Sequence, residues 1–168
     1  MTPNAYQINN RFVFILALVG IIFFPGFHLS YFAPYLVIAF YRYTRFALLW
    51  RAIGCGTIID IFSATPYFGL NALNYFIISW ILYGQKQNFF EDKQSTIPLM
   101  TLFFSILSTI TSYILFLFFT KTTTLTFKWF LTDIIIMPFI DATYAYGISL
   151  FFQITNYFRK FIQQRRMR

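Results

Sequence analysis

Apolar runs separated by short polar or helix-breaking segments dominate the chain. Pro25 and Gly26 end the first run, Arg42 and Arg45 follow the second, and a turn at residues 63–66 ends the third. Proline and glycine end helices, and clustered charged residues mark the end of an apolar run because they lie outside an apolar layer. The pattern therefore predicts helices near residues 12–24, 31–41, 46–62, 67–83, 97–119 and 130–157.

Composition indicates that lipid is the solvent for these helices. The chain is 58% apolar and 24% aromatic, and only 11% of its 168 residues are charged, against roughly a quarter in an ordinary soluble domain. So few charges cannot cover a water-facing surface, which excludes a soluble enzyme or binding module. A membrane-crossing helix needs about 20 apolar residues, or about 17 when short. We expect one all-α domain over residues 1–168, an integral membrane bundle of about six spans.

The basic residues predict the orientation of the bundle. Lys and Arg concentrate on the cytoplasmic side of membrane proteins. If both ends are cytoplasmic, the outer side receives only Lys121 and Lys128, and the inner side receives Arg11, Arg42, Arg45, Lys86, Lys93, Arg159, Lys160, Arg165, Arg166 and Arg168. The net charge of +8 is therefore spread between apolar runs, and we expect no nucleic-acid partner. Residues 158–168 are predicted to form a basic cytoplasmic tail that meets anionic lipid.

The first two runs are short. Residues 12–24 lack a cleavage site of the signal-peptide kind, so we expect a short first helix. Whether residues 12–41 make one broken span or two is left open by the sequence.

The sequence carries no recognisable catalytic motif, and we predict that the protein is not an enzyme. It contains no glycine-rich phosphate loop and no metalloprotease or hydrolase motif. His28 and Cys55 are far apart and do not suggest a metal site. No cofactor and no metal are expected.

Four charged residues fall within the predicted spans and are the main candidates for chemistry: Arg51, Asp60, Asp133 and Asp141. Charges at this depth are costly, so they face a partner, a cavity or the bundle interior. By helical rise, Asp60 and Asp133 share a level near the outer boundary, with Lys128 in reach. Arg51 is the expected partner of Asp141. Interhelical pairing and a substrate site are both compatible with this set.

Small residues predict close helix packing in the third run. Gly54 and Gly56 flank Cys55, and small residues let helix backbones approach each other in lipid. Gly69 is expected to permit a tight entry into the fourth helix.

The segment from Gly54 to Tyr83 resembles the rod shape-determining protein MreD family. The resemblance rests on a helix ending in Gly-x-x-x-Asp, a small-residue turn, and a glycine opening the next helix: Gly56, Asp60, Ser63, Gly69, Leu70, Ala72 and Leu73. Pro34 at the start of the second run and the basic tail are also similar to the family. The last run departs from it, because Pro138 lies far before Arg159 and Asp141 is not a family feature.

The resemblance implies a non-enzymatic scaffold of cell elongation in the bacterial inner membrane. Such a protein would bind an MreC-like membrane protein and indirectly link MreB filaments to peptidoglycan synthesis by RodA and its transpeptidase. Partner binding would fall at Asp60, Ser63, Pro66 and Gly69. The loop at residues 85–93 and the tail would face the cytoplasm.

The alternative is the substrate-binding S component of an energy-coupling-factor vitamin transporter, which has a similar size and also six helices. In that case the same buried polar residues would hold a vitamin. The first helix offers Ala17 and Gly20 but no small-xxx-small docking pair, and the outer loops are short.

Overall fold

The computed structural model describes residues 9–23, 29–63, 67–85, 96–120 and 130–166. These residues are helical with short connections, and no strand occurs among them, so the prediction of an all-α fold is confirmed. The elements are α1 (Asn10–Phe23), α2 (Ala33–Arg42), α3 (Arg45–Phe62), α4 (Leu70–Gln85), α5 (Thr96–Thr120), the π-helix η2 (Phe130–Ile136) and α7 (Met137–Arg166). Each predicted apolar run overlaps one of these helices or, for the last run, the continuous pair η2 and α7.

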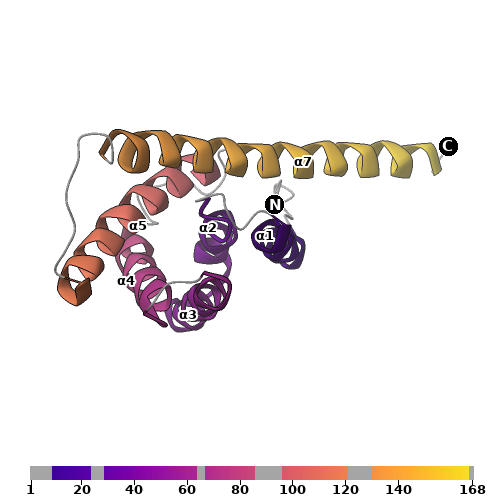
Figure 1. Ribbon diagram of the computed structural model, residues 1–168. Coiled ribbons are helices and arrows are strands. Elements are labelled where there is room, and N and C mark those ends of the chain that lie inside the picture. Colours follow the sequence, from indigo (N-terminus) through magenta and orange to yellow (C-terminus); the bar gives the residue numbers. More distant parts are fainter. Residues whose placement is uncertain (1–8, 24–28, 64–66, 86–95, 121–129, 167–168) are drawn as a thin grey trace.

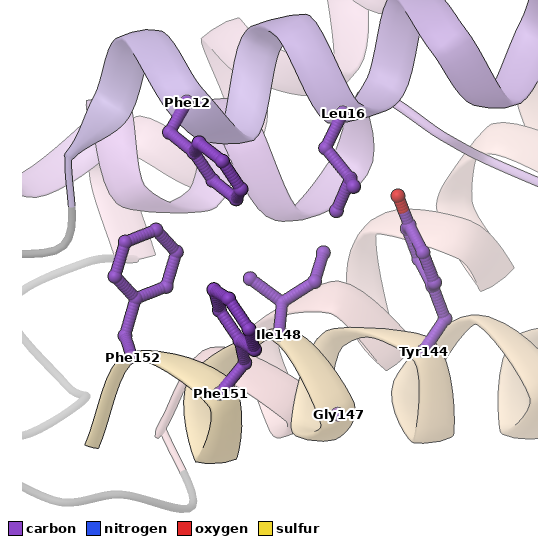
Figure 2. Close-up of a pocket in the computed structure, with 7 residues that line it drawn as sticks. All are labelled: Phe12, Leu16, Tyr144, Gly147, Ile148, Phe151 and Phe152. Carbon is purple, nitrogen blue, oxygen red and sulfur yellow. The ribbon is translucent and has the colours of Figure 1, made fainter. Parts of the chain in front are cut away.

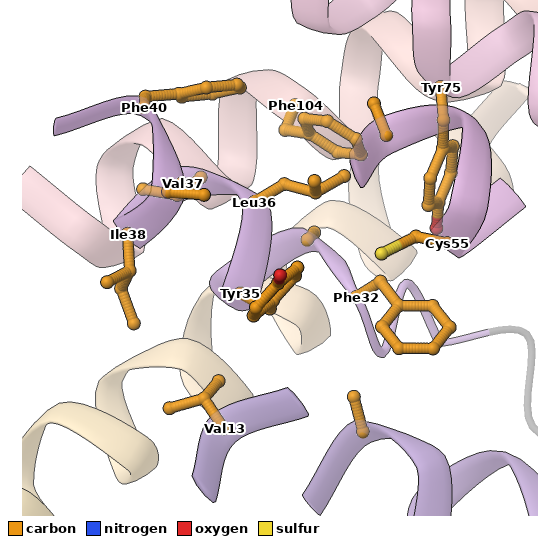
Figure 3. Close-up of a cluster of buried hydrophobic side chains, with 14 of the residues drawn as sticks. Val13, Phe32, Tyr35, Leu36, Val37, Ile38, Phe40, Cys55, Tyr75 and Phe104 are labelled. Atoms are coloured by element: carbon orange, nitrogen blue, oxygen red, sulfur yellow. The ribbon is translucent and has the colours of Figure 1, made fainter. Parts of the chain in front are cut away.

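Helix α2 forms the centre of the molecule (Figure 3). Every residue from Ala33 to Phe40 is buried. Side chains around it come from α1, α3, α4 and α5, for example Val13, Cys55, Tyr75 and Phe104. A helix that is apolar on all sides is a buried helix. With 10 residues, α2 is about 15 Å long, so it cannot cross a hydrocarbon layer of about 30 Å by itself.

Among the described residues, two helices are long and apolar enough to span a membrane. They are Thr96–Phe119 and the continuous segment Phe130–Thr155. Only 11% of the first and 28% of the second are buried inside the protein. Their outward faces are apolar, which is the surface expected next to lipid. The other helices are shorter, with 14 residues in α1, 18 in α3 and 16 in α4.

The last run is one long helical segment that changes its winding at Pro138. The π-helix η2 ends two residues before Pro138, and α7 continues to Arg166. Proline lacks an N–H and clashes with the carbonyl four residues earlier, which lies within η2, and the wider π-turn relieves that clash. Residues 158–166 continue the helix as the last turns of α7, and their place as a basic cytoplasmic tail stays a prediction. The final turns of α7 extend past α1 in Figure 1.

Helices α3 and α4 pack most extensively against each other, and Gly56 sets their separation. A Cβ at Gly56 would lie 2.5 Å from the Asn71 carbonyl oxygen and 2.6 Å from the Ala72 nitrogen. Only backbone atoms meet it there, so no side chain can move aside. At Gly54 a Cβ would meet nothing within 4 Å. Gly56 therefore has the geometry of a packing residue, and Gly54 does not.

Gly56→Ala is expected to lower the free energy of unfolding by about 1–3 kcal/mol, because the added methyl must separate two backbones. Gly54→Ala is the matched control, since it lies two residues away in open space and gains helix propensity. Unfolding in mixed micelles, followed by circular dichroism, measures both. Equal stability of the two variants would contradict the assigned close approach.

Candidate functional site

Asp60 binds the first turn of the next helix. Its carboxylate accepts hydrogen bonds from the backbone N–H groups of Gly69 (3.1 Å), Asn71 (3.2 Å) and Ala72 (3.1 Å), and from the Asn71 side-chain amide (2.9 Å). Asp60 is 5% exposed. An ionised carboxylate can remain buried when several donors surround it. Asp60 therefore fastens the end of α3 to the start of α4.

The need for Asp60 follows from the residue that precedes α4. Gly69 closes the first turn by accepting the Leu73 N–H at 2.9 Å, and its φ of +96° favours glycine. Glycine has no side chain with which to cap a helix. The free N–H groups at a helix start need an acceptor and favour a negative charge. Asp60 supplies both from the neighbouring helix.

Large apolar side chains point outward around this corner. We define the outer corner patch as Ile61, Phe62, Phe68, Phe118 and Phe119, all of which are exposed. Phe68 is 72% exposed and Phe118 is 79% exposed. Tyr67 packs against Phe119 with ring centroids 6.0 Å apart, which connects the corner to the end of α5. The hydrogen bonds of Asp60 thus hold the outer corner patch in a defined position.

The four expected partner-contact residues do not share one environment. Asp60 is buried and fully engaged, Gly69 is half-buried at the helix start, and Ser63 is the extended residue that ends α3. Pro66 lies outside the described residues. The side chains available to a partner are the neighbouring exposed aromatic residues of the outer corner patch, which the sequence analysis did not select.

Asp141 ties α7 to α5 and to the residue that leads into α2. It is 2% exposed, and it accepts the Ser30 backbone N–H at 3.0 Å and the Ser105 hydroxyl at 2.5 Å. Tyr31 and Tyr144 pack edge to face beside it, with centroids 6.2 Å apart. Asp141 therefore joins three parts of the chain through hydrogen bonds.

The expected pair of Arg51 and Asp141 is wrong. Arg51 donates to the Tyr35 hydroxyl at 3.2 Å and lies over the Tyr43 ring, 3.4 Å from its centroid. Helix α3 packs against α4, α2 and α1, whereas α7 packs mainly against α5. Arg51 and Asp141 were expected at a similar depth, but the helices that carry them, α3 and α7, are not neighbours. A guanidinium over an aromatic face is a favourable alternative to an ion pair.

Asp133 forms its described hydrogen bonds with a neighbouring residue and with α5. It lies half-buried in η2, where its carboxylate accepts the Thr132 hydroxyl at 3.3 Å and its carbonyl accepts the Thr109 hydroxyl at 3.2 Å. The groups that bind Asp60 come from α4 and its N-cap, not from η2. Lys128, which was expected within reach of Asp60 and Asp133, lies outside the described residues, as do His28 and Lys121, so this expectation stays a prediction.

A polar stripe on α5 was missed by the sequence interpretation. Asn74 is buried on α4, and its amide donates to the hydroxyls of Ser108 (2.9 Å) and Ser112 (2.8 Å). Ser105 on the same helix donates to Asp141. The spacing of Thr101, Ser105, Ser108 and Ser112 places them on one helical face. That spacing was the available signal, and such hydroxyls hydrogen-bond across helices in lipid.

No protein-family model, no curated protein and no solved structure matches the chain. Within the described ranges, no group of three or more His, Cys, Asp or Glu residues is placed to hold a metal ion.

Asp60→Asn is expected to reduce the free energy of unfolding by about 1.5–3 kcal/mol. The amide replaces an acceptor oxygen by a donor, which faces either the N–H groups of Gly69 and Ala72 or the two donors of Asn71. Asp133→Asn is the matched control, with a change within about 0.5 kcal/mol. Chemical denaturation in mixed micelles measures both. Wild-type stability in the Asp60 variant would contradict the claim that the Asp60 hydrogen bonds hold the end of α3 to the start of α4.

A double-mutant cycle distinguishes the partners of Asp141. Ser105→Ala and Asp141→Ala should couple by about 1 kcal/mol because they remove one shared hydrogen bond. Arg51→Ala and Asp141→Ala should add within about 0.5 kcal/mol. Both values come from unfolding free energies of single and double variants. Strong coupling between Arg51 and Asp141 would contradict the assignment of Ser105 as the partner of Asp141 and support an Arg51–Asp141 pair.

Proposed function

We propose that this protein is a non-enzymatic inner-membrane scaffold of the MreD type, which binds an MreC-like membrane protein and connects MreB filaments with peptidoglycan synthesis by RodA and its transpeptidase. The observation that carries the proposal is the outer corner patch, an aromatic surface held by Asp60. The two span-length helices support a membrane location.

The geometry of the corner suits partner docking. Gly56 and Asp60 hold α3 against the first turn of α4, so Phe68 and Phe62 project from a fixed base. Large rigid aromatic side chains are the usual anchors of protein interfaces. The complementary partner is an apolar transmembrane helix, which MreC-like proteins possess. Both buried carboxylates, Asp60 and Asp141, are bonded within the protein, which favours a structural role for them.

A multi-pass arrangement with a cytoplasmic C-terminus is part of the proposal. Phe12, next to Arg11 at the start of α1, packs against Phe151 and Phe152 of α7, whose basic turns follow. At the start of α3, Arg45 lies over the Trp80 ring of α4, 3.9 Å from its centroid. These contacts support an inner boundary marked by basic and aromatic side chains. The outer corner patch then belongs to the opposite side.

Affinity purification of the tagged protein from its native membrane, with mass spectrometry of the copurified proteins, tests the proposal. The expected result is a single-span MreC-like protein, with or without wall synthases. Recovery of a transmembrane coupling subunit with ATPases would replace the scaffold by a transporter S component.

Phe68→Ala is expected to reduce recovery of the MreC-like protein at least tenfold, as loss of an anchor residue does. Phe46→Ala is the matched control, because Phe46 is 73% exposed but lies at the opposite end of α3. Quantitative mass spectrometry, normalised to the tagged protein, compares the two variants. Equal recovery would exclude the outer corner patch as the docking surface.

A further inference from the structure

An apolar groove separates α1 from α7. It has a volume of about 350 Å³ and is lined by Phe12 and Leu16 from α1 and by Tyr144, Gly147, Ile148, Phe151 and Phe152 from α7 (Figure 2). This volume falls within the range of ligand pockets in proteins. Tyr144 contributes the one polar side chain of the lining, so the groove suits a hydrocarbon ligand.

The shape of the groove depends on Gly147. A Cβ at this position would meet nothing within 4 Å, so glycine leaves unfilled space rather than allowing a close helix contact. Phe12 closes one end by packing on Phe152, with centroids 5.6 Å apart. Phe12 and Phe151 are also exposed, so the groove is accessible from outside the protein. It lies along the span-length segment of α7, where the surroundings would be lipid.

Basic residues follow the Phe12 and Phe152 end of the groove. Arg11 is exposed and precedes Phe12 on α1. Arg159 and Lys160 lie in the same helix as Phe152, about 10 Å further along at the usual helical rise. This distance matches the step from the hydrocarbon layer into the headgroup region. The groove therefore ends where the sequences of both helices become basic.

We propose that this groove binds one acyl chain of an anionic phospholipid, with the lipid phosphate beside the exposed Arg11, at the end of the groove beyond which the sequence of α7 becomes basic. Basic residues beside grooves between transmembrane helices recognise anionic headgroups in this way. The site is separate from the outer corner patch and does not depend on the scaffold proposal. Lipid occupancy would also join the short helix α1 to α7.

Native mass spectrometry tests the site. The full-length protein is reconstituted in nanodiscs of equal phosphatidylglycerol and phosphatidylcholine, released, and scored for retained lipid. Wild type is expected to retain one phosphatidylglycerol preferentially. Gly147→Phe should abolish this retention by filling the groove, while Gly84→Phe should leave it intact. Gly84 is an exposed helical glycine whose Cβ would also meet nothing within 4 Å.

The charge requirement is tested separately. Arg159→Gln/Lys160→Gln should weaken retention about 25-fold, at about fivefold for each charge. Arg42→Gln/Arg45→Gln is the charge-matched control and should retain the lipid as wild type does. Equal retention of phosphatidylcholine, or equal behaviour of the Gly147 and Gly84 variants, would overturn the proposal. So would a protein dimer that Gly147→Phe abolishes, because the groove would then receive a second copy.

Discussion

The hydrogen bonds between Asp60 and the first turn of α4 determine the geometry of the α3–α4 pair. A buried carboxylate requires donors, and a helix that begins at Gly69 requires an acceptor that glycine cannot provide. The N–H groups of the first turn of α4 supply the donors, and the Asp60 carboxylate supplies the acceptor. Gly56, one turn before Asp60, lets the two backbones approach closely enough for the carboxylate to reach. The same contact positions the aromatic side chains that we assign to partner docking.

Elsewhere in the fold, too, polar side chains form hydrogen bonds between helices inside the protein, and apolar side chains cover the outer faces. Asp141 and Ser105 bind each other between α7 and α5, and Asn74 reaches the hydroxyls of α5 from α4. Helix α2 is buried along most of its length and packs against α5, α1 and α3. In the membrane location that we propose, such interhelical hydrogen bonds would help the helices to associate, because lipid gives apolar helices little reason to do so. The outward faces of α5 and α7 are left for lipid or for a partner (Figure 1).

Apolar runs and helix-breaking residues were sufficient to predict the helices, because both signals act locally. The buried position of α2 was not predicted, since run length does not reveal what surrounds a helix. Asp60 was selected correctly as unusual, but its partner groups lie nine to twelve residues later and depend on the turn geometry. The pairing of Arg51 with Asp141 was wrong because depth along a helix gives no information about which helices are neighbours. The apolar groove was not predictable, because Gly147 creates it only when α1 lies against α7.

Site-specific photo-crosslinking in native membranes tests the central claim most directly, with a photoreactive phenylalanine analogue placed at Phe68 and, for comparison, at Phe46. The account predicts a protein crosslink to a single-span MreC-like partner from position 68 only. It also predicts loss of that crosslink when Asp60→Asn is added and the protein is still present in the membrane. Crosslinks to lipid alone at position 68, or the same protein crosslink from both positions, would contradict it.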